Sequence, residues 1–513
     1  TSDMPDFLFG QKINAKSAKQ KLECIAGGEM RDKIIVNLFR EIIMLFNSYE
    51  FIFIFLPLTL FGYYAAAKFI KNQAAKLFLI LASVCFYSYW DINNLPILLV
   101  SIVVNYLFGR SLTNNRSKKV LVAGITFNLL FLGYFKYTNF VLDNLNYLFD
   151  AGFAMQDIVL PLGISFFTFT QTAYLVDVYR GETKTYSKSD YLLFVTIFPH
   201  LIAGPILYHK DMIPQFSQAE RYKINYKNLT YGILWFTVGL FKKVVIADKL
   251  AVYADRVFNN TANLTMLDAW GGSLAYTLQL YFDFSGYSEM AIGLGLMFNY
   301  NLPLNFNLPY RATSIIDFWR RWHMTLSAFL KNYLYIPLGG NRTGHHLRNI
   351  MITMFLGGLW HGAGWTFIFW GVLHGIYICV NHLWRKTKYP LPQWLNWFIT
   401  FNAVNIAWIF FRAASFNDAV NVLTAMFDVN RFAYPYSKFL AKYFSVFGNK
   451  ESTLIITDNL LMLIGFIVLS VLVFKKENIE KFSVYLTATI MAIIFFYAVL
   501  QLSSVTTFLY FQF

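Results

Sequence analysis

Long uninterrupted apolar runs are the feature that most constrains what this chain can fold into. Three of them are FIFIFLPLTLFGYYAAAKF at 51–69, LLMLIGFIVLSVLVF at 460–474 and VYLTATIMAIIFFYAVL at 484–500. A bilayer core about 30 Å thick is crossed by roughly 20 helical residues. Only 14% of the 513 residues are charged, against the roughly 25% that is usual in soluble domains. The sequence therefore predicts an all-α, polytopic transmembrane protein and excludes a soluble globular fold.

The charges between the apolar runs predict how the chain is oriented. Basic loops at 68–76, 110–119 and 180–188 alternate with a loop at 143–157 that has aspartates and no Lys or Arg. Lys and Arg gather on the cytoplasmic side of membranes, so we expect the basic loops inside and the acidic loop and the C-terminus outside. The net charge of +15 mostly reflects such loops, and no basic patch indicates a nucleic-acid partner. The expected number of crossings is about twelve.

Two apolar stretches do not fit a single crossing each. The stretch LLFVTIFPHLIAGPILYHK (192–210) contains two prolines and has basic residues on both sides. We expect 192–209 to be re-entrant and to line a cavity, because non-helical backbone at membrane depth must be buried in protein or face a cavity. A proline-kinked spanning helix is the alternative. The run 351–384 is too long for one crossing, and we expect two crossings that meet at Gly362–Gly364.

The first 43 residues differ from the rest of the chain. They contain no spanning run and lack the apolar stretch of a typical signal peptide. Met44 then opens MLFNSYEF, which is typical of a natural start. We expect residues 1–43 to be a polar extension, either artificial or translated from upstream, or alternatively to form an amphipathic surface helix around 30–43. Residues 44–513 are expected to form a single transmembrane domain.

The segment DFWRRWHMTLSAFLKNYLYIPLGGNR (317–342) packs charged groups among aromatic residues. On a helix, Asp317, Arg320 and Arg321 share one face through i, i+3 and i+4 spacing, and His323 lies off that face. An ion pair there would fix the segment at an interface. An interfacial amphipathic helix with aromatic anchors is the alternative interpretation.

The segment GGLWHGAGW (357–365) places His361 inside an apolar run, flanked by glycines and tryptophans. Ionisable groups at this depth are costly and usually functional. Neutral imidazole can accept a proton near neutral pH, since its reference pKa is about 6.5. His361 is therefore a candidate catalytic base, and a histidine that is hydrogen-bonded between helices is the alternative.

Other ionisable residues lie in or near apolar segments. Asp283 and Glu289 are expected to line a polar cavity, to pair with the arginines of 317–342, or to form buried structural pairs. Lys242 and Lys243 fit poorly within their span, and we expect them to snorkel. Four further histidines appear isolated and are interpreted as structural: His200, His209, His374 and His382. The sequence contains no metal-binding spacing and no phosphate-binding loop, and its three cysteines do not indicate a disulfide framework.

Taken in order, these strings resemble the membrane-bound O-acyltransferase family, specifically its bacterial polysaccharide branch. That branch includes alginate and peptidoglycan O-acetyltransferases and the D-alanyl transferase of teichoic acids. The resemblance covers nearly everything after residue 43, and it is carried by MLFNSYEF (44–51), LIAGPILYHKDMIPQF (201–216), YFDFSGYSEMAIGLGLMFNYNLPLNFNLPY (281–310), DFWRRWHMTLS (317–327), NYLYIPLGGNR (332–342), GGLWHGAGWTFIFWG (357–371) and FLYFQF (508–513). The YIPLGGNR and FQF features look more like the acetyltransferases than the D-alanyl enzyme.

The resemblance implies many helices around a central tunnel, with His361 as the catalytic histidine and His323 as the second signature histidine. It implies no permanently bound cofactor and a donor substrate, acetyl-CoA or another acyl thioester, that enters from the cytoplasm. In some relatives a C-terminal tyrosine, supplied in cis or by a small partner, is proposed to receive the acyl group, and Tyr510 matches it. We also expect Arg320 and Arg321 to bind the donor's phosphates.

The predicted function is transfer of an acetyl group across the bacterial inner membrane. The acceptor would be an extracytoplasmic polysaccharide, alginate or peptidoglycan, and an extracytoplasmic SGNH-type acetyltransferase would be the partner. D-alanyl-type transfer is the alternative within the family. A membrane transporter or channel is the alternative from another class, because broken helices with polar groups also mark transporters. A third alternative is a scaffold that only holds a soluble transferase.

Overall fold

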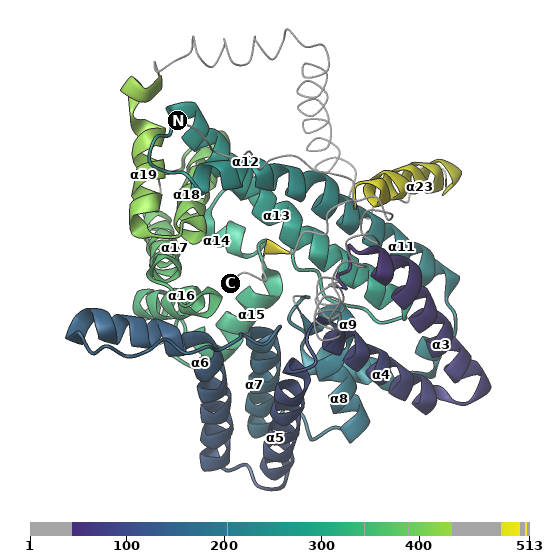
Figure 1. Ribbon diagram of the computed structural model, residues 1–513. Helices are drawn as coiled ribbons and strands as arrows, with labels where there is room; N and C mark the ends of the chain where they lie inside the picture. The colour runs from purple at the N-terminus through teal and green to yellow at the C-terminus, as the bar shows by residue number, and fades with distance from the viewer. Residues whose placement is uncertain are drawn as a thin grey trace, which may run out of the picture. The chain divides into compact units, whose positions relative to one another are not determined.

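The computed structural model describes residues 44–202, 204–342, 344–387, 389–432, 484–502 and 508–509. All regular secondary structure in these residues is helical (Figure 1), which confirms the predicted all-α class. Six helical stretches among them are long and apolar enough to cross a membrane. The expected span at 459–474 and residues 1–43 lie outside the described residues. The count of about twelve crossings therefore stays a prediction.

The first half of the domain is a group of packed helices. Helix α3 packs on α4, and α5 and α6 both pack against α7 (Figure 1). Their bounds are η1 Phe51–Phe55 (a π-helical turn), α3 Leu56–Phe69, α4 Asn72–Trp90, α5 Asn94–Asn114, α6 Lys118–Phe149 and α7 Ile164–Arg180.

The apolar stretch after α7 is broken, as its prolines predict. Helix α8 (Lys188–Thr196) ends at Ile197, which leaves the helical conformation at ψ 115°. A four-residue helix, α9 (Phe198–Leu201), follows, and residues 204–208, which precede α10 (His209–Met212), are non-helical. The N–H of Phe198, freed by the break, donates to the Ser83 hydroxyl at 3.1 Å. The broken backbone is thus buried in protein, as non-helical backbone at membrane depth must be. That it enters and leaves on one side stays a prediction.

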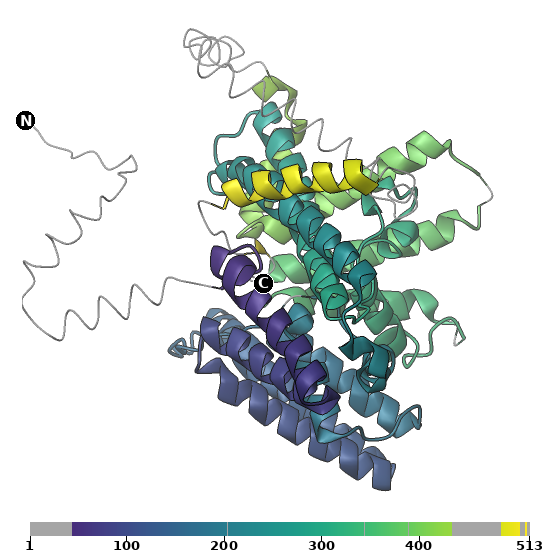
Figure 2. The same ribbon diagram turned by 90° about the vertical axis from the view of Figure 1, so that its right-hand side faces the viewer.

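Helices α11 (Tyr226–Phe241) and α13 (Met266–Met297) cross at glycines. A Cβ on Gly239 would come within 2.4 Å of the Gly286 carbonyl oxygen, and one on Gly293 within 2.5 Å of the Gly232 carbonyl oxygen. Such small-residue contacts let helix backbones approach closely where lipid offers no hydrophobic driving force. The π-helical turn η4 (Lys242–Ala247) joins α11 to α12 (Asp248–Phe258), and α23 (Val484–Leu500) packs across α11 (Figure 2).

The lysines of η4 do not snorkel. Both are buried, and each forms an ion pair: Lys242 with Glu289 at 2.5 Å, and Lys243 with Asp283 and Asp248 at 2.7 Å each. The expected pairing of the two acidic residues with the arginines of 317–342 is therefore wrong, and buried pairing with lysines is what occurs. The reason is geometric, since η4 packs directly against α13.

The long run at 351–384 consists of two helices that turn at Gly362–Gly364, as predicted. Helix α16 packs along α17, where a Cβ on Gly358 would lie 2.4 Å from the Phe367 carbonyl oxygen. The helices of this part are α14 Ile315–Trp319, α15 Met324–Leu330, η6 Lys331–Tyr335, α16 His346–His361, α17 Trp365–Trp384, α18 Gln393–Arg412 and α19 Phe416–Phe427. Four single turns complete the described elements: η2 Ile213–Ser217, η3 Ala219–Tyr222, η5 Pro309–Arg311 and η7 Val429–Phe432.

Candidate active site

His323 is fully buried at the start of α15, and Asn305 holds its ring. The His323 Nδ1 lies 3.0 Å from Asn305 Oδ1, which also accepts from the Thr325 N–H at 3.3 Å and the Thr325 hydroxyl at 3.0 Å. Because these donors identify the asparagine atom as the carbonyl oxygen, His323 must donate from Nδ1. In the neutral ring Nε2 is then the unprotonated nitrogen, so it is the one that can accept a proton.

The backbone of His323 is strained, and the same asparagine stabilises it. His323 has φ 41° and ψ 57°, in the left-handed region that a side chain with a Cβ rarely adopts. The next N–H, that of Met324, donates to the Asn305 carbonyl at 2.9 Å. The Thr325 hydroxyl also accepts the Ile206 N–H at 3.1 Å, which ties the broken segment to this turn. Strain of this kind persists where surrounding contacts enforce it, and it clusters at functional sites.

His361 ends α16, and its ring lies among aromatic side chains. The ring centroid is 5.0 Å from Trp370, 4.9 Å from Trp360 and 5.3 Å from Phe411. Aromatic contacts connect this ring to the turn of His323, because Trp370 stacks on Trp408 at 5.5 Å and Trp408 packs at 5.0 Å on Trp322, the residue before His323. The structure therefore brings together the two histidines that the sequence singled out, which are on different helices. We call this pair, with Asn305 and Trp370, the histidine site.

His374 extends the histidine site and is not isolated, contrary to expectation. The Trp370 ring contacts both the His374 ring, at 4.9 Å between centroids, and the His361 ring, at 5.0 Å. The Trp319 indole N–H donates to His374 Nδ1 at 3.2 Å. Neutral His374 therefore carries its proton on Nε2, which has no hydrogen-bond partner among the described residues. Its surroundings are those of a structural histidine, and no spacing in the sequence indicates its contact with Trp370.

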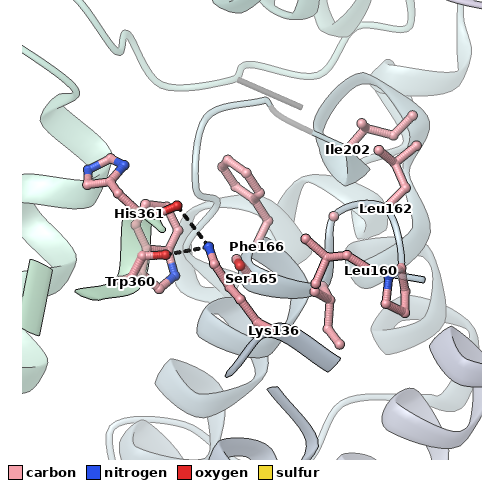
Figure 3. A pocket seen from close by; sticks show the side chains of 11 residues that line it. Lys136, Leu160, Leu162, Ser165, Phe166, Ile202, Trp360 and His361 are labelled. Carbon is pink, nitrogen blue, oxygen red and sulfur yellow. Dashed lines mark hydrogen bonds between the residues drawn. The ribbon is translucent and has the colours of Figure 1, made fainter. Parts of the chain in front are cut away.

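A pocket of about 90 Å³ opens beside the end of α16 (Figure 3). It is lined by Lys136 of α6, by residues 160–166 at the start of α7, by Ile202, and by Trp360 and His361. The Lys136 ammonium donates to the carbonyls of Trp360 at 2.6 Å and His361 at 2.9 Å, so it caps α16. Figure 3 shows that the His361 ring points away from the pocket and that its backbone carbonyl faces Lys136. Ile202 confirms that the broken segment lines a cavity.

Residues 508–509 lie among the helices near the histidine site. Phe508 and Leu509 are buried and form the short yellow segment at the centre of Figure 1. The Leu509 N–H donates to Asp283 Oδ2 at 3.0 Å. The residue after Asp283, Phe284, packs edge-on against the His323 ring with centroids 4.8 Å apart. Tyr510 itself lies outside the described residues.

The two arginines before His323 have different environments. Arg321 Nε donates to both oxygens of Asp317, at 3.0 and 2.9 Å, which confirms the expected ion pair. Arg320 is exposed, and no carboxylate lies within ion-pair distance of it in the part of the chain that the structure describes. Arg320 is therefore the freer of the two to meet an anionic ligand.

A second polar cluster surrounds Asp177, near the end of α7. Its Oδ2 meets His209 Nε2 at 3.0 Å, the Tyr333 hydroxyl at 2.8 Å and Lys210 Nζ at 3.0 Å. Partial burial by itself lowers the pKa of Lys210, but Glu182 and Asp177 hold that pKa above its ordinary value. His209 is thus not isolated, although its role here is to join α7, α10 and η6. The sequence contained no spacing that would have revealed this cluster.

Comparisons with known proteins agree with these features. Residues 84–417 match the family of membrane-bound O-acyltransferases (MBOAT). Peptidoglycan O-acetyltransferase of Helicobacter pylori is 45% identical over 464 residues, which are 83% of this chain and 86% of that protein. Probable alginate O-acetylase AlgI of Pseudomonas aeruginosa is 44% identical over 398 residues, 75% of each protein. Teichoic acid D-alanyltransferase of Streptococcus thermophilus is 26% identical over 293 residues, 50% of this chain and 69% of that protein.

Proposed function

Since the chain belongs to the membrane-bound O-acyltransferase family and is therefore a multi-pass membrane enzyme that transfers acyl groups, we propose that it acetylates an extracytoplasmic polysaccharide. The donor would be a cytoplasmic thioester such as acetyl-CoA, and the membrane would be the bacterial inner membrane. Relatives named for peptidoglycan and for alginate are both similar over most of the chain. The D-alanyltransferase is similar over half of it. Acetyl is therefore the acyl group we favour, with peptidoglycan or alginate as the polymer.

The single observation that supports this mechanism most is the buried pair of histidines with Phe508 and Leu509 buried nearby. A buried neutral imidazole is suited to take a proton from a hydroxyl, and such catalysis contributes about 10²–10⁴-fold. In our mechanism the acceptor hydroxyl is that of Tyr510, which follows Leu509 directly. Tyr510 would accept the acyl group from the donor in one reaction and pass it to the polysaccharide outside in the next.

The transfer step balances as a thioester-to-ester exchange. His361 takes the phenolic proton of Tyr510 while the phenol oxygen attacks the thioester carbonyl carbon. The tetrahedral intermediate collapses with cleavage of the carbon–sulfur bond, and the thiolate recovers the proton from the imidazolium. The products are an acetyl ester on Tyr510 and the free thiol. An SGNH-type partner then moves the acetyl group to a polymer hydroxyl and regenerates the phenol.

His323 acts beside the base in this mechanism. Its Nδ1–H is held by Asn305, so its Nε2 can relay a proton or orient the donor. Arg320 would bind donor phosphate, because guanidinium groups recognise phosphate through charge-assisted hydrogen bonds. Arg321 would hold the segment in place through Asp317.

The test is mass spectrometry of the C-terminal peptide after incubation with an isotopically labelled acetyl thioester. We expect label on the peptide that contains Tyr510 in the wild type and none in Tyr510→Phe, which lacks one oxygen. Label from a D-alanyl thioester instead of the acetyl thioester would favour the D-alanyl alternative. If Tyr510→Phe transfers acetyl to polymer at the wild-type rate, the terminal tyrosine is not the acceptor. No thioester consumption by the purified protein would favour the transporter alternative.

A further inference from the structure

A single neighbouring helix binds the carbonyl groups at the end of α16. The Tyr137 hydroxyl donates to the Leu359 carbonyl at 2.7 Å. Lys136 Nζ, one residue earlier in α6, donates to the carbonyls of Trp360 at 2.6 Å and His361 at 2.9 Å (Figure 3). The last four carbonyls of an α-helix have no partner within the helix. Two adjacent side chains of α6 therefore bind three of these four groups, and one of the three belongs to His361 itself. We call Lys136 and Tyr137 the α6 clamp.

His361 is the last residue of α16, so the position of its ring depends on how firmly the last helical turn is held. The chain leaves the helix at Gly362, with φ −154° and ψ 148°, and is still extended at Gly364, with φ −165° and ψ 148°. Helix ends fray, and a glycine next to the end gives the backbone more conformations than other residues do. A histidine at this place keeps a fixed position only if contacts from outside the helix hold the turn.

Helix α6 also holds the other side of this glycine turn, at the start of α17. The Trp365 indole N–H donates to Asn144 Oδ1 at 2.8 Å, and the Trp365 ring packs against Phe140 with centroids 5.8 Å apart. Residues 136, 140 and 144 share one face of α6 through i, i+4 spacing. This face therefore holds both helices that meet at the turn beside His361.

The charge of Lys136 is used on helix carbonyls and not in an ion pair. Lys136 lies within a helix long enough to cross a membrane. No carboxylate is within ion-pair distance of it in the residues that the structure describes. A charged group at membrane depth is costly and usually marks a function. The carbonyls that Lys136 binds carry the negative end of the α16 dipole, about half an elementary charge, and this end takes the place of a counter-ion.

We infer that Lys136 and Tyr137 are positioning residues for His361, and that they fix the imidazole by holding the last turn of α16. They act through the backbone, because the His361 carbonyl faces Lys136 while its ring points away from the pocket that Lys136 lines (Figure 3). The role of His361 as base rests on the proposed function, whereas the hold of the α6 clamp on α16 does not.

The chain offers a matched pair of variants for the test. Tyr137→Phe removes the one oxygen that binds Leu359. Tyr134→Phe makes the same substitution three residues earlier in α6, on an exposed side chain whose hydroxyl makes no hydrogen bond to the residues that the structure describes. Lys136→Met removes the other half of the clamp, and Lys136→Arg keeps a cationic donor there.

Transfer from isotopically labelled acetyl-CoA, measured per folded molecule well below each thermal midpoint, separates positioning from mere stability. We expect kcat to fall about a hundredfold in Lys136→Met, since a displacement of about 1 Å can cost 10²-fold, and about two- to tenfold in Tyr137→Phe, which loses one neutral hydrogen bond. The KM for the donor should stay near the wild-type value, Lys136→Arg should recover part of the loss, and Tyr134→Phe should match the wild type. Wild-type kcat in folded Lys136→Met and Tyr137→Phe, or an equal loss in Tyr134→Phe, would overturn the positioning role.

Hydrogen exchange measures the hold of the clamp without any reference to catalysis. Exchange of the peptide that ends α16, followed by mass spectrometry on the full-length protein in lipid nanodiscs, should rise about tenfold or more in Lys136→Met. It should rise less in Tyr137→Phe, the milder variant that covers the case in which Lys136→Met does not fold, and not at all in Tyr134→Phe. Unchanged exchange in Tyr137→Phe and in folded Lys136→Met would refute the clamp. If His361→Gln transfers acetyl at the wild-type rate, the proposed function fails, and the exchange experiment still decides whether α6 holds α16.

Discussion

The ion pair between Lys242 and Glu289 allows a quantitative test of how buried charge holds the helices together. The Lys242 side chain is 6% exposed and that of Glu289 is 16% exposed, and their charged atoms are 2.5 Å apart. No other ion-pair partner of either residue occurs within the residues that the structure describes. Lys242→Met would therefore leave a carboxylate buried without its cation.

The expected cost follows from this geometry. Removing one partner of a buried pair destabilises by about 3–5 kcal/mol, whereas replacing both partners by apolar residues is often neutral or stabilising. Lys242→Met should thus lower the folded-to-unfolded ratio by roughly 10²–10⁴-fold, at 1.36 kcal/mol per factor of ten. The double variant Lys242→Met/Glu289→Met should recover most of the loss. A snorkelling lysine, the interpretation from sequence, would cost little when replaced.

Equilibrium unfolding by denaturant in mixed lipid–detergent micelles measures these free energies of unfolding. A double-mutant cycle over the wild type, the two single variants and the double variant isolates the coupling between the residues. A Lys242→Met protein as stable as the wild type, or a double variant less stable than both single variants, would refute the reasoning.

Three further outcomes follow from the contacts around the histidine site. Gly358→Ala should lower the free energy of unfolding by about 1–3 kcal/mol through overpacking, because its Cβ would lie 2.4 Å from a backbone oxygen. Gly133→Ala is the control, since its Cβ would meet nothing within 4 Å. Equal thermal midpoints of the two variants would contradict this. Asn305→Ala should lower the free energy of unfolding by roughly 1–3 kcal/mol for each buried donor left unpaired. It should also slow acyl transfer, because Asn305 holds the His323 ring. An unchanged transfer rate would show that the asparagine has no part in the mechanism. Lys136→Met should lower the thermal midpoint, because α16 loses its cap. Lys136→Arg keeps a donor at this position and should lower the midpoint less. Equal midpoints of the two variants would contradict the capping role.

Much of the architecture could be predicted from sequence because its cause is local. Apolar run length gave the helices, and the glycines at 362–364 gave the turn between α16 and α17. His361 was found because an ionisable group in an apolar run is conspicuous, whereas His323 was assigned a role through the resemblance to the family.

Long-range partners could not be predicted in the same way. Asn305 is one of several asparagines in its segment, and only the fold shows that it binds His323. The pairing of Lys243 with Asp283 was missed because η4 and α13 meet through tertiary packing, which sequence spacing does not report. The hydrogen bond between Leu509 and Asp283 connects residues that are 226 positions apart, far beyond any local pattern.

The central claim is that His361 is the base that activates the acceptor hydroxyl. Single-turnover transfer from a labelled acetyl thioester, compared between wild type, His361→Gln and the control His382→Gln, tests it most directly. We predict a loss of about 10²–10⁴-fold in His361→Gln, with normal folding and with the control near wild type. A His361→Gln protein that is folded and transfers acetyl within a few-fold of the wild-type rate would contradict the claim.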